Sequence, residues 1–501
     1  MDYDAIIIGA GLGGLTAGAK LARSGKKVLL IEQHTIPGGC ATHFKRKDFT
    51  IEVSLHEMDG LDAIDLKTKI FEDLDIFKHV ELIRLPEFYR YTKAEIDFVM
   101  PDDSSRAIRA LTERFPEERK GIADYFRTIG GIRKELSQLP RSRLWQILSL
   151  PIFPLLFPLI TKYANKALGD FLDETINDEQ LKLLLIANLG YYHDDPYSMA
   201  MLYFSIAQDA YYAGGWYVRG GSQKLSDYLA ASITSTGGKI LYRHMVEEII
   251  VEKRRAVGVK YRKKGKKNDG LLTARAGHIL ANNAVPNLTE MLPERESKKL
   301  KKSISELKRS CSIITLYLGF SKPAKELGNK HYSTFIANPK VNSLKDFAED
   351  LKHSPYDKRG LIFVDHSQID SGLAPEGKSL GLLATTDYAE NWEGLSRIAY
   401  KKKKEVVSQQ MIEKLESLIP GIKDHIEYYE LSTAKTIERY TLNPGGATYG
   451  FAQTTEQSGN KRYGQKSPIK NLHIASAWGF PGGGFSGAII GGYLASLKVK
   501  T

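Results

Sequence analysis

The chain has few cysteines: Cys40 and Cys311 are the only two among its 501 residues. Two cysteines cannot form a disulfide framework, and these two do not have the paired spacing of a zinc site. No other metal-ligand cluster is evident, so we expect no metal and a reducing, cytoplasmic setting. Residues 1–4 (MDYD) lead at once into an apolar segment, and we therefore expect no secretory signal, which needs a charged region and a cleavage site.

Long hydrophobic runs are also missing. The one long apolar stretch, residues 144–160, is shorter than the roughly 20 continuous apolar residues that a membrane-spanning helix needs. Three prolines interrupt it: Pro151, Pro154 and Pro158. The composition is otherwise that of a folded protein, with 42% hydrophobic and 26% charged residues. A chain of 501 residues is too long for one ordinary core, so we expect two closely joined domains.

The charge is unbalanced toward the positive side, with a formal net charge of +12. Such a surface suits nucleic acid, an anionic membrane face or an acidic ligand. The lysine-rich segments 262–267, 298–302 and 401–404 contain no interleaved aromatic residues and belong to no recognisable nucleic-acid-binding module. We interpret them as solvated faces and expect no nucleic-acid partner.

The first 32 residues contain a complete dinucleotide-binding pattern. Residues 5–8 are an unbroken apolar run, which is typical of a strand buried in a parallel sheet. The turn that follows, residues 9–14 (GAGLGG), leads into a small-residue helix over 15–24, and residues 28–31 form a second strand that ends at Glu32. A GxGxxG between a strand and a helix, with an acid after the next strand, is far more specific than the glycines alone.

Each residue of this pattern has a physical role. Gly9 permits the tight turn, Gly11 lets the backbone approach a pyrophosphate, and Gly14 lets the helix pack against the strand. Leu12 and Gly13 lie at the helix N-terminus, where unpaired N–H groups and the positive end of the helix dipole attract phosphate. The carboxylate of Glu32 can accept hydrogen bonds from both ribose hydroxyls.

A second glycine-rich turn lies near the other end of the chain. Residues 471–478 are expected to form a buried strand, residues 479–487 (GFPGGGFSG) a turn, and residues 488–494 an apolar helix. A strand, a glycine-rich turn and a helix again direct backbone N–H groups at an anionic or carbonyl group.

Between these turns the sequence resembles a known family. Residues 32–39 (EQHTIPGG) place a glycine pair, Gly38 and Gly39, shortly after the acid, and residues 49–56 (FTIEVSLH) follow. This pattern resembles the FAD-binding flavoproteins of the amine oxidase and phytoene desaturase superfamily, with Glu52 where the family usually has Asp and Ser54 where it usually has Gly. Residues 214–222, 237–259, 279–284 and 436–450 extend the resemblance along the whole chain, and it is strongest to the retinol saturase branch.

The resemblance implies a cofactor, FAD, and a set of residues around it. In relatives the residue matching Val246 meets the adenine through its backbone, and the terminal turn meets the flavin ring. The implied contacts, with those of the first motif, are Gly9, Gly11, Leu12, Gly13, Gly14, Glu32, Gln33, Gly38, Gly39, Val246, Asn283, Trp478, Gly483, Gly484, Phe485 and Ser486.

The fold class that follows is α/β, a Rossmann-type FAD-binding domain with an inserted α+β substrate domain, as in amine oxidases and GDP-dissociation inhibitors. The FAD-binding domain is expected to be discontinuous, over 1–65, 215–285 and 440–501, and the substrate domain to comprise 66–214 and 286–439. No second GxGxxG follows a strand, which disfavours the plan with a second dinucleotide domain.

The resemblance implies an oxidoreductase that saturates, desaturates or isomerises carbon–carbon double bonds of a hydrophobic carotenoid-like or retinoid-like molecule. Two alternatives stay open: an amine-oxidase-like enzyme with a polar substrate, and a non-catalytic prenyl-binding module. Candidate proton donors or acceptors are His56, Tyr449 and Glu438. Aromatic residues over 191–217 either line a substrate tunnel or pack the core, and the oligomeric state is not predicted.

Residues 141–166 are the part of the substrate half that we expect to touch a membrane. Four cations flank the apolar stretch: Arg141, Arg143, Lys162 and Lys166. Apolar side chains can enter the acyl region while such cations meet the headgroups, which would make the protein peripherally membrane-associated. The alternative is a buried helix of the substrate domain with proline breaks.

Overall fold

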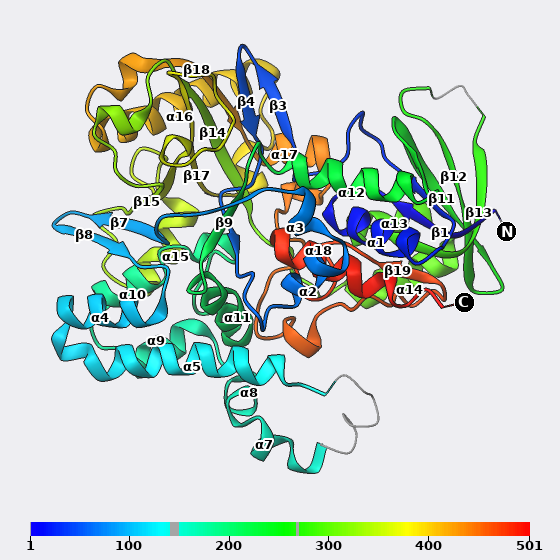
Figure 1. Ribbon diagram of the computed structural model, residues 1–501, viewed down its shortest axis with the longest axis horizontal. Coiled ribbons are helices and arrows are strands. Elements are labelled where there is room, and N and C mark those ends of the chain that lie inside the picture. The colour runs from blue at the N-terminus through cyan, green and yellow to red at the C-terminus, as the bar shows by residue number, and fades with distance from the viewer. Residues whose placement is uncertain (1, 141–149, 267–269, 501) are drawn as a thin grey trace.

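The computed structural model describes residues 2–140, 150–266 and 270–500. Within these residues the strands form two large sheets of seven strands each, which lie on opposite sides of the molecule in Figure 1. A layer of helices lies below the second sheet in the same view. The two sheets and this layer surround the site described below.

The first sheet contains the predicted Rossmann-type strands. In spatial order it comprises β10 (Lys239–Leu241), β2 (Val28–Ile31), β1 (Tyr3–Ile8), β13 (Leu272–Ala281), β12 (Arg255–Lys263) and β11 (His244–Glu252), with β19 (Leu472–Ile474) also paired to β13. Pairing is parallel from β10 to β13 and from β13 to β19, whereas β11, β12 and β13 are antiparallel. The first half of β13 therefore belongs to an antiparallel meander and its second half to the parallel sheet.

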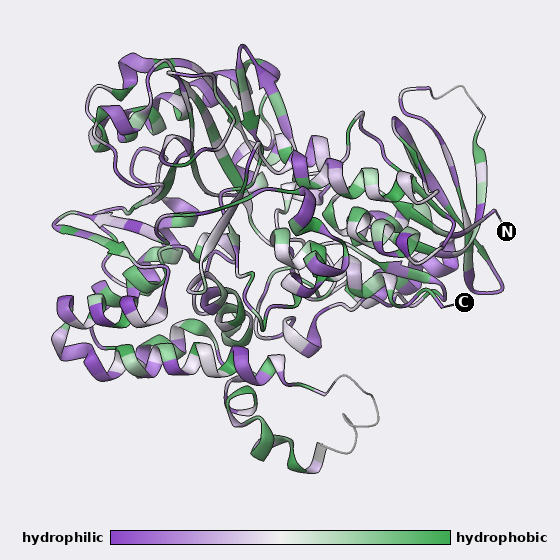
Figure 2. Cartoon of the chain, in the orientation of Figure 1, coloured by the Kyte–Doolittle hydropathy of each residue, from purple (hydrophilic) through white to green (hydrophobic). Residues whose placement is uncertain are grey.

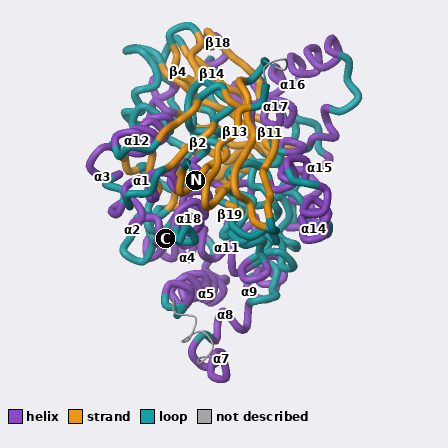
Figure 3. Tube along the Cα trace, turned by 90° about the vertical axis from the view of Figure 1, so that its right-hand side faces the viewer, coloured by secondary structure: helices purple, strands orange, loops and turns teal. Residues whose placement is uncertain are grey.

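Both faces of the parallel part are covered, which explains its unbroken apolar strands. Ala5 and Ile7 face one core with α1 (Leu12–Arg23), α12 (Gln223–Ser235) and α18 (Gly484–Ser496). Ile6 and Ile8 face another core with α13 (Leu288–Met291) and α14 (Glu294–Ile304). Figure 3 shows α1 and α12 on one side of this sheet and α14 on the other.

The second sheet is mostly antiparallel. It runs in the order β18 (Ile426–Ser432), β14 (Ser312–Phe320), β17 (Ser379–Asp387), β16 (Leu361–Asp365), β15 (Ser333–Ile336), β7 (Tyr89–Lys93) and β8 (Ile96–Met100). Leu316 and Leu318 of β14 pack against α16 (Arg397–Leu418), whereas Tyr317 between them belongs to the core shared with the first sheet. One face of this sheet is thus directed toward the nucleotide-binding half.

The remaining elements connect these layers. The helical layer comprises α4 (Ser104–Arg114), α5 (Arg119–Ser137), α7 (Phe153–Leu156), α8 (Pro158–Tyr163), α9 (Leu168–Thr175), α10 (Glu179–Leu185) and α11 (Met201–Tyr211). Between the sheets lie α2 (Leu66–Asp73), α3 (Ile76–His79), α17 (Ala434–Thr441), the hairpin of β3 (His43–Arg46) and β4 (Phe49–Glu52), and the small sheet of β5 (Met58–Asp59), β9 (Gly215–Val218) and β6 (Leu82–Arg84). The helix α15 (Leu344–His353) packs against the second sheet beside α10.

The strands of the first sheet all fall within 1–65, 215–285 and 440–501, and those of the second within 66–214 and 286–439. This distribution supports the predicted division into an FAD-binding domain and a substrate domain, whose bounds stay a prediction. The terminal helix begins earlier than expected, at Gly484, and the strand before it is shorter, ending at Ile474.

The apolar stretch 144–160 is described only from residue 150 on, so its first part lies outside the described residues. Pro158 is the first residue of α8, directly after α7 and Phe157, whereas Pro154 lies in the first turn of α7. Both short helices project below α5, and α7 is among the most hydrophobic parts of the ribbon (Figures 1 and 2). Among the described residues, no helix has the length and apolar character needed to cross a membrane.

Candidate active site

The two glycine-rich turns meet at one edge of the first sheet. They follow β1 and β19, which flank β13 in parallel, so their carboxyl ends lie on the same side. A Cβ atom at Gly13 would lie 1.9 Å from the carbonyl oxygen of Ala475, and one at Gly492 would lie 2.0 Å from that of Gly13. The backbones therefore approach so closely that only glycine fits at these positions.

A cavity of about 890 Å³ opens at this edge and extends toward the second sheet. Gly14 does not line it; a Cβ there would lie 2.2 Å from the Gly9 carbonyl oxygen, so this glycine serves the packing of α1 on β1. The predicted site residues that line the cavity are Gly9, Gly11, Leu12, Gly13, Glu32, Gln33, Gly38, Gly39, His56, Val246, Glu438, Tyr449, Asn283, Trp478, Gly483, Gly484, Phe485 and Ser486. Residues far apart in the sequence thus share one cavity.

One end of the cavity has the features of a nucleotide site. The buried carboxylate of Glu32 accepts hydrogen bonds from the backbone N–H groups of Ala10 (2.6 Å) and His34 (2.7 Å). Gly11 caps α1 without a side-chain hydrogen bond, which leaves the first N–H groups of the helix available to a phosphate. The His34 ring lies 2.6 Å from the carbonyl oxygen of Tyr440, so α17 closes this end.

Several buried polar atoms of the cavity wall lack protein partners. They are Asn283 Oδ1, Thr448 Oγ1 and Ser476 Oγ, all in residues that line the cavity. Buried polar groups in native proteins are normally satisfied, so unpartnered acceptors and hydroxyls around a cavity of this size fit a polar ligand such as FAD. The glycine turns, Glu32 and these atoms are the residues that would hold it.

The sequence prediction missed Asn282, which lies under the first glycine turn. Its Nδ2 donates to the Gly9 carbonyl oxygen at 3.3 Å, and the same atom is 2.8 Å from the Cβ position of Gly11. Asn282 precedes Asn283 at the carboxyl end of β13. The position of both residues beyond a parallel strand was a signal that could have identified the pair.

Glu52 and Ser54 differ from the usual family residues, and the structure accommodates both. The buried Glu52 carboxylate accepts from the backbone N–H (2.7 Å) and the hydroxyl (2.7 Å) of Ser222 and from the backbone N–H of Leu55 (3.1 Å). The Ser54 hydroxyl donates to the carbonyl oxygen of Cys40 at 2.8 Å. These bonds anchor the segment that carries His56.

The other end of the cavity is aromatic and apolar. It adjoins a second cavity of about 90 Å³ between the second sheet and the helical layer, and His56, Tyr191 and Ile313 line both. Burial lowers the pKa of His56 to about 4, so its imidazole is uncharged at neutral pH. The Tyr449 hydroxyl donates to the carbonyl oxygen of Gly190 at 3.1 Å, and burial raises its pKa.

The aromatic residues over 191–217 divide between the two interpretations given above. Tyr191, Tyr192, Tyr203 and Tyr211 line the large cavity. Phe204, Tyr212 and Tyr217 are buried in the surrounding core. Tunnel lining and core packing therefore both occur within this segment.

The surroundings of Glu438 differ from those of His56 and Tyr449. It is exposed on α17, where its carboxylate accepts from the backbone N–H of Gly445 at 3.0 Å. The same helix carries Tyr440, whose carbonyl oxygen contacts His34 at the nucleotide end. A direct catalytic role for Glu438 stays a prediction that this position does not support.

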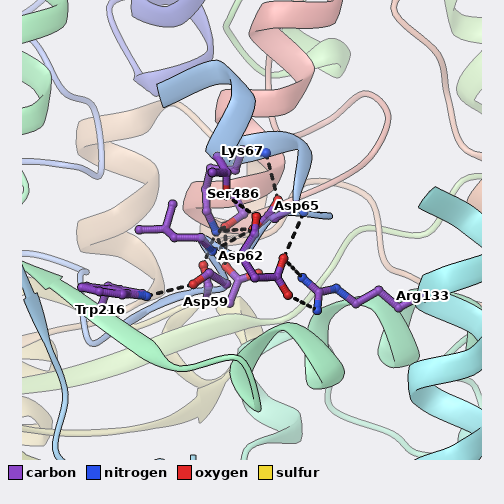
Figure 4. A network of polar contacts seen from close by, with 10 residues as sticks. Asp59, Asp62, Asp65, Lys67, Arg133, Trp216 and Ser486 are labelled. Atoms are coloured by element: carbon purple, nitrogen blue, oxygen red, sulfur yellow. Dashed lines mark hydrogen bonds and ion pairs between the residues drawn. The ribbon is translucent and has the colours of Figure 1, made fainter. Parts of the chain in front are cut away.

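A polar network anchors the terminal turn (Figure 4). The fully buried Lys67 Nζ donates to Ser486 Oγ at 2.8 Å and lies 3.1 Å from Asp59 Oδ1 and 3.4 Å from Asp65 Oδ2. Ser486 Oγ also donates to Asp59. These contacts connect the N-terminus of α18 to α2 and β5.

The network continues into the helical layer. Asp62, in the segment between β5 and α2, receives two hydrogen bonds of 2.8 Å from Arg133 of α5, which also bonds Asp209 of α11 at 3.3 Å. The position of the terminal turn is therefore coupled to the helices that flank the aromatic end. No sequence pattern indicated this coupling.

A discontinuous nucleotide-binding unit that opens onto an aromatic chamber defines a class of dinucleotide-dependent oxidoreductases. Comparison with known proteins gives the family. The model of flavin-containing amine oxidoreductases matches residues 12–499, so the chain belongs to this family and is an FAD-dependent oxidoreductase. The predicted family and cofactor are confirmed.

Individual relatives are similar over nearly the full chain. All-trans-retinol 13,14-reductase of Danio rerio is 26% identical, over 98% of this chain and 84% of that protein. Chloroplastic prolycopene isomerase of Daucus carota is 27% identical, over 99% of this chain and 80% of that protein. Wild-type putrescine oxidase bound to putrescine has a TM-score of 0.64 at 14% identity, covering 100% of this chain and 99% of that chain, and this likeness confirms the fold class.

Proposed function

We propose that the enzyme acts on carbon–carbon double bonds of a hydrophobic polyene or isoprenoid, by saturation, desaturation or cis–trans isomerisation. The observation that carries the proposal is the chamber beyond His56 and Tyr191, because a conjugated hydrocarbon has no charged group and needs an apolar site. Its walls include Tyr91, Leu183, Phe335, Val341, Phe347, Leu361 and Ile362. The two relatives named for a retinoid and a carotenoid reaction support the same class of substrate.

The residues of the chain have distinct tasks in this proposal. Bound FAD would supply the hydride chemistry. Glu32 and the two glycine turns would hold the nucleotide, while the network around Lys67 fixes the turn that carries Ser486. The aromatic walls orient the substrate and exclude water, which protects the reacting carbons from competing reactions.

Anaerobic incubation of the holoenzyme with candidate polyenes tests the proposal. Oxidised enzyme is mixed with each polyene while flavin absorbance and product mass are followed, and photoreduced enzyme is tested in parallel. A loss or gain of two hydrogens with the matching flavin change identifies desaturation or saturation, and an altered isomer of unchanged mass identifies isomerisation. Flavin bleaching by amines, with none of these polyene reactions, would favour the amine-oxidase-like alternative. A protein that binds prenyl lipid without any redox change would favour the binding module.

We further propose that α7, which projects below α5, dips into a membrane surface. Leu155 is 82% exposed, Leu156 50% and Ile152 48%, while Phe157 and Ile160 face inward. Lys162 is exposed on the next helix, where it can meet lipid headgroups. Such a contact would let a water-insoluble substrate enter from the bilayer.

Liposome co-sedimentation with Leu155→Glu tests this second proposal. We expect binding to anionic vesicles to fall about tenfold or more, because the variant places a charge in the acyl region. Ile398→Glu is the matched control, since Ile398 is also 82% exposed but lies on α16. Equal loss in both variants, or no loss in either, would contradict a membrane contact at α7.

A further inference from the structure

Glu57 is a buried carboxyl group whose two oxygens make no well-formed hydrogen bond. The residue lines the large cavity, is 7% exposed, and has no hydrogen bond at either Oε1 or Oε2. Gly215 of β9 makes room for it, since a Cβ there would lie 2.8 Å from Glu57 Oε2. Glu52, by contrast, is buried and accepts hydrogen bonds from three donor groups of Ser222 and Leu55. A buried acid that the protein leaves unsatisfied points to a ligand in the cavity.

The surroundings of Glu57 favour the uncharged acid. Burial raises the pKa of Glu57 well above its ordinary value, and the neighbouring Asp59 carboxylate adds to the rise. The Tyr191 hydroxyl lies close enough for a weak hydrogen-bonding effect that lowers the pKa, although its geometry is not that of a well-formed hydrogen bond. Among the described residues, no lysine or arginine contributes to the pKa of Glu57. Asp59 differs, because it is paired with Lys67.

Apart from Asp59, which is paired with Lys67, the titratable groups around Glu57 are uncharged at neutral pH. His56 is neutral because burial lowers its pKa to about 4. Burial also raises the pKa of five tyrosines on which a charge at Glu57 would act, namely Tyr89, Tyr191, Tyr192, Tyr211 and Tyr332. These tyrosines come from β7, from α11, from the loop before α11 and from the segment preceding β15. Besides the Asp59–Lys67 pair, neutral groups from several elements therefore surround the carboxyl.

Its position also suits proton transfer to a substrate. His56, the preceding residue, and Tyr191 line both the large cavity and the apolar chamber. Glu57 thus lies where a substrate in the chamber would approach the flavin-binding cavity. A neutral acid in such a place can give a proton to carbon, as a charged carboxylate cannot.

We propose that Glu57 is the acid–base residue of the reaction, which supplies the hydrogen that does not come from the flavin. The inference rests on the proposed double-bond chemistry. In the direction of saturation, bound FAD in its reduced form would supply a hydride to one alkene carbon. The π electron pair moves to the adjacent carbon, which takes the proton from Glu57 as the O–H bond breaks. The carboxylate then regains a proton from water, and desaturation follows the reverse path.

Infrared spectroscopy tests the protonation state independently of the substrate. The holoenzyme at neutral pH is expected to show the C=O stretching band of a protonated carboxyl that shifts in D₂O. The band should be absent in Glu57→Gln and retained in Glu118→Gln. Glu118 is equally buried at 7% exposure, but accepts from the backbone N–H groups of Asn177 and Asp178 away from both cavities. Because burial also raises the pKa of Glu52 and Asp209, the band of Glu57 is read from the difference between the wild-type and Glu57→Gln spectra. A difference spectrum without a protonated-carboxyl band overturns the proposal.

Turnover in D₂O tests the transfer itself. With enzyme photoreduced in D₂O and a polyene that is saturated, the wild-type product should carry two deuteriums, one from flavin N5, which takes its hydrogen from solvent, and one delivered through Glu57. Glu57→Gln should slow product formation by about 10²–10⁴-fold, with unchanged FAD affinity and flavin spectrum. Glu57→Asp, which keeps an acid, should restore part of the rate, and Glu118→Gln should keep the wild-type rate. A Glu57→Gln enzyme as fast as wild type overturns the role of Glu57. A wild-type enzyme that converts no polyene overturns the proposed function instead, while the infrared result still decides the state of the carboxyl.

Discussion

The two ends of the large cavity are built differently. At the nucleotide end, backbone groups do most of the work: both oxygens of Glu32 accept from backbone N–H groups, and glycines bring main chains into contact. At the aromatic end, buried side chains carry polar atoms that have no partner, among them the Glu57 carboxyl and the Tyr191 hydroxyl. The nucleotide end is thus shaped mainly by backbone contacts and keeps some polar atoms free for a cofactor, whereas the polar groups of the aromatic end are buried among aromatic side chains.

This difference determines what each end tolerates. Backbone contacts at van der Waals distance leave no space for an added methyl group, so the nucleotide end should be sensitive to glycine substitutions. Unpaired polar groups in a desolvated chamber respond instead to a change of charge, because burial penalises the ionised form. The network around Lys67 connects the two ends: it fixes the backbone of the terminal turn through Ser486, and it contains a buried charge.

The largest effect is expected from Gly13→Ala. Its methyl group would lie 1.9 Å from the Ala475 carbonyl oxygen, so α1 and the strand β19 must separate. We expect FAD binding to fall by at least about 100-fold and the unfolding free energy by about 4 kcal/mol or more. Flavin absorbance after reconstitution and urea unfolding measure these quantities. Gly464→Ala is the control, since its Cβ would meet nothing within 4 Å, and equal behaviour of the two variants would refute the close-contact explanation.

The next effect concerns the network that joins the two ends. Lys67→Met leaves the carboxylates of Asp59 and Asp65 without their buried cation and removes a donor to Ser486. Removal of one partner from a buried ion pair costs about 3–5 kcal/mol. The matched change Lys298→Met, at an ion pair with Glu294 whose side chains are 74% and 82% exposed, should cost less than about 1 kcal/mol. Urea unfolding of the apoprotein distinguishes them, and a cost for Lys67→Met no greater than for Lys298→Met would contradict a stabilising role of the network.

The same contrast explains what could be predicted from the sequence. The parallel strands, the first glycine turn and Glu32 are local patterns, and both glycine turns lie at one cavity as expected. Glu57 and Lys67 escaped prediction because their significance depends on partners from distant segments, such as Gly215 and Ser486. The sequence shows that residue 57 is acidic, but not whether a cation lies beside its carboxyl group in the folded protein.

The bounds of elements were harder to predict for a related reason. The sequence predicts one strand over residues 471–478, yet pairing with β13 ends at Ile474, after which the chain turns toward the cavity. In the apolar stretch, Pro158 starts a new helix, so Leu155 is exposed while Ile160 packs inward. Hydrophobicity alone cannot distinguish these outcomes, because it does not specify which face is covered.

A third prediction concerns the charge response of the aromatic end. The ordinary pKa of a glutamate is 4.5, and that of Glu57 is raised in the folded protein. Above pH 4.5 the unfolded chain therefore releases this proton while the folded chain keeps it. The contribution of Glu57 to stability then falls by about 1.4 kcal/mol per pH unit until its folded pKa is passed. Glu57→Gln cannot ionise, so its stability relative to wild type should increase with pH over this window.

Urea unfolding of wild type and Glu57→Gln at several pH values measures this gap. A stability difference between the two proteins that does not change with pH would show that Glu57 ionises alike in the folded and unfolded states. The distinction between the two ends of the cavity would then fail. Glu118→Gln is the control, because Glu118 accepts two backbone hydrogen bonds that the amide replaces poorly. That variant should be less stable than wild type at neutral pH.

The smallest expected effect is on the reactivity of Cys40, which lies between the nucleotide end and the aromatic end of the cavity, and it leaves stability unchanged. Cys40 lines the cavity after the Gly38-Gly39 pair and is exposed, although its surroundings raise the pKa of the thiol to about 11. A thiol reagent should label Cys40 of the apoprotein slowly at neutral pH. The labelling rate should increase about tenfold per pH unit, because only the thiolate reacts. FAD should protect Cys40 by filling the cavity, whereas the buried Cys311 should stay unlabelled in both forms. Cys40→Ser should abolish labelling. If FAD leaves the labelling rate of Cys40 unchanged, the cofactor does not contact this wall, and Cys40 does not belong to the nucleotide end of the cavity.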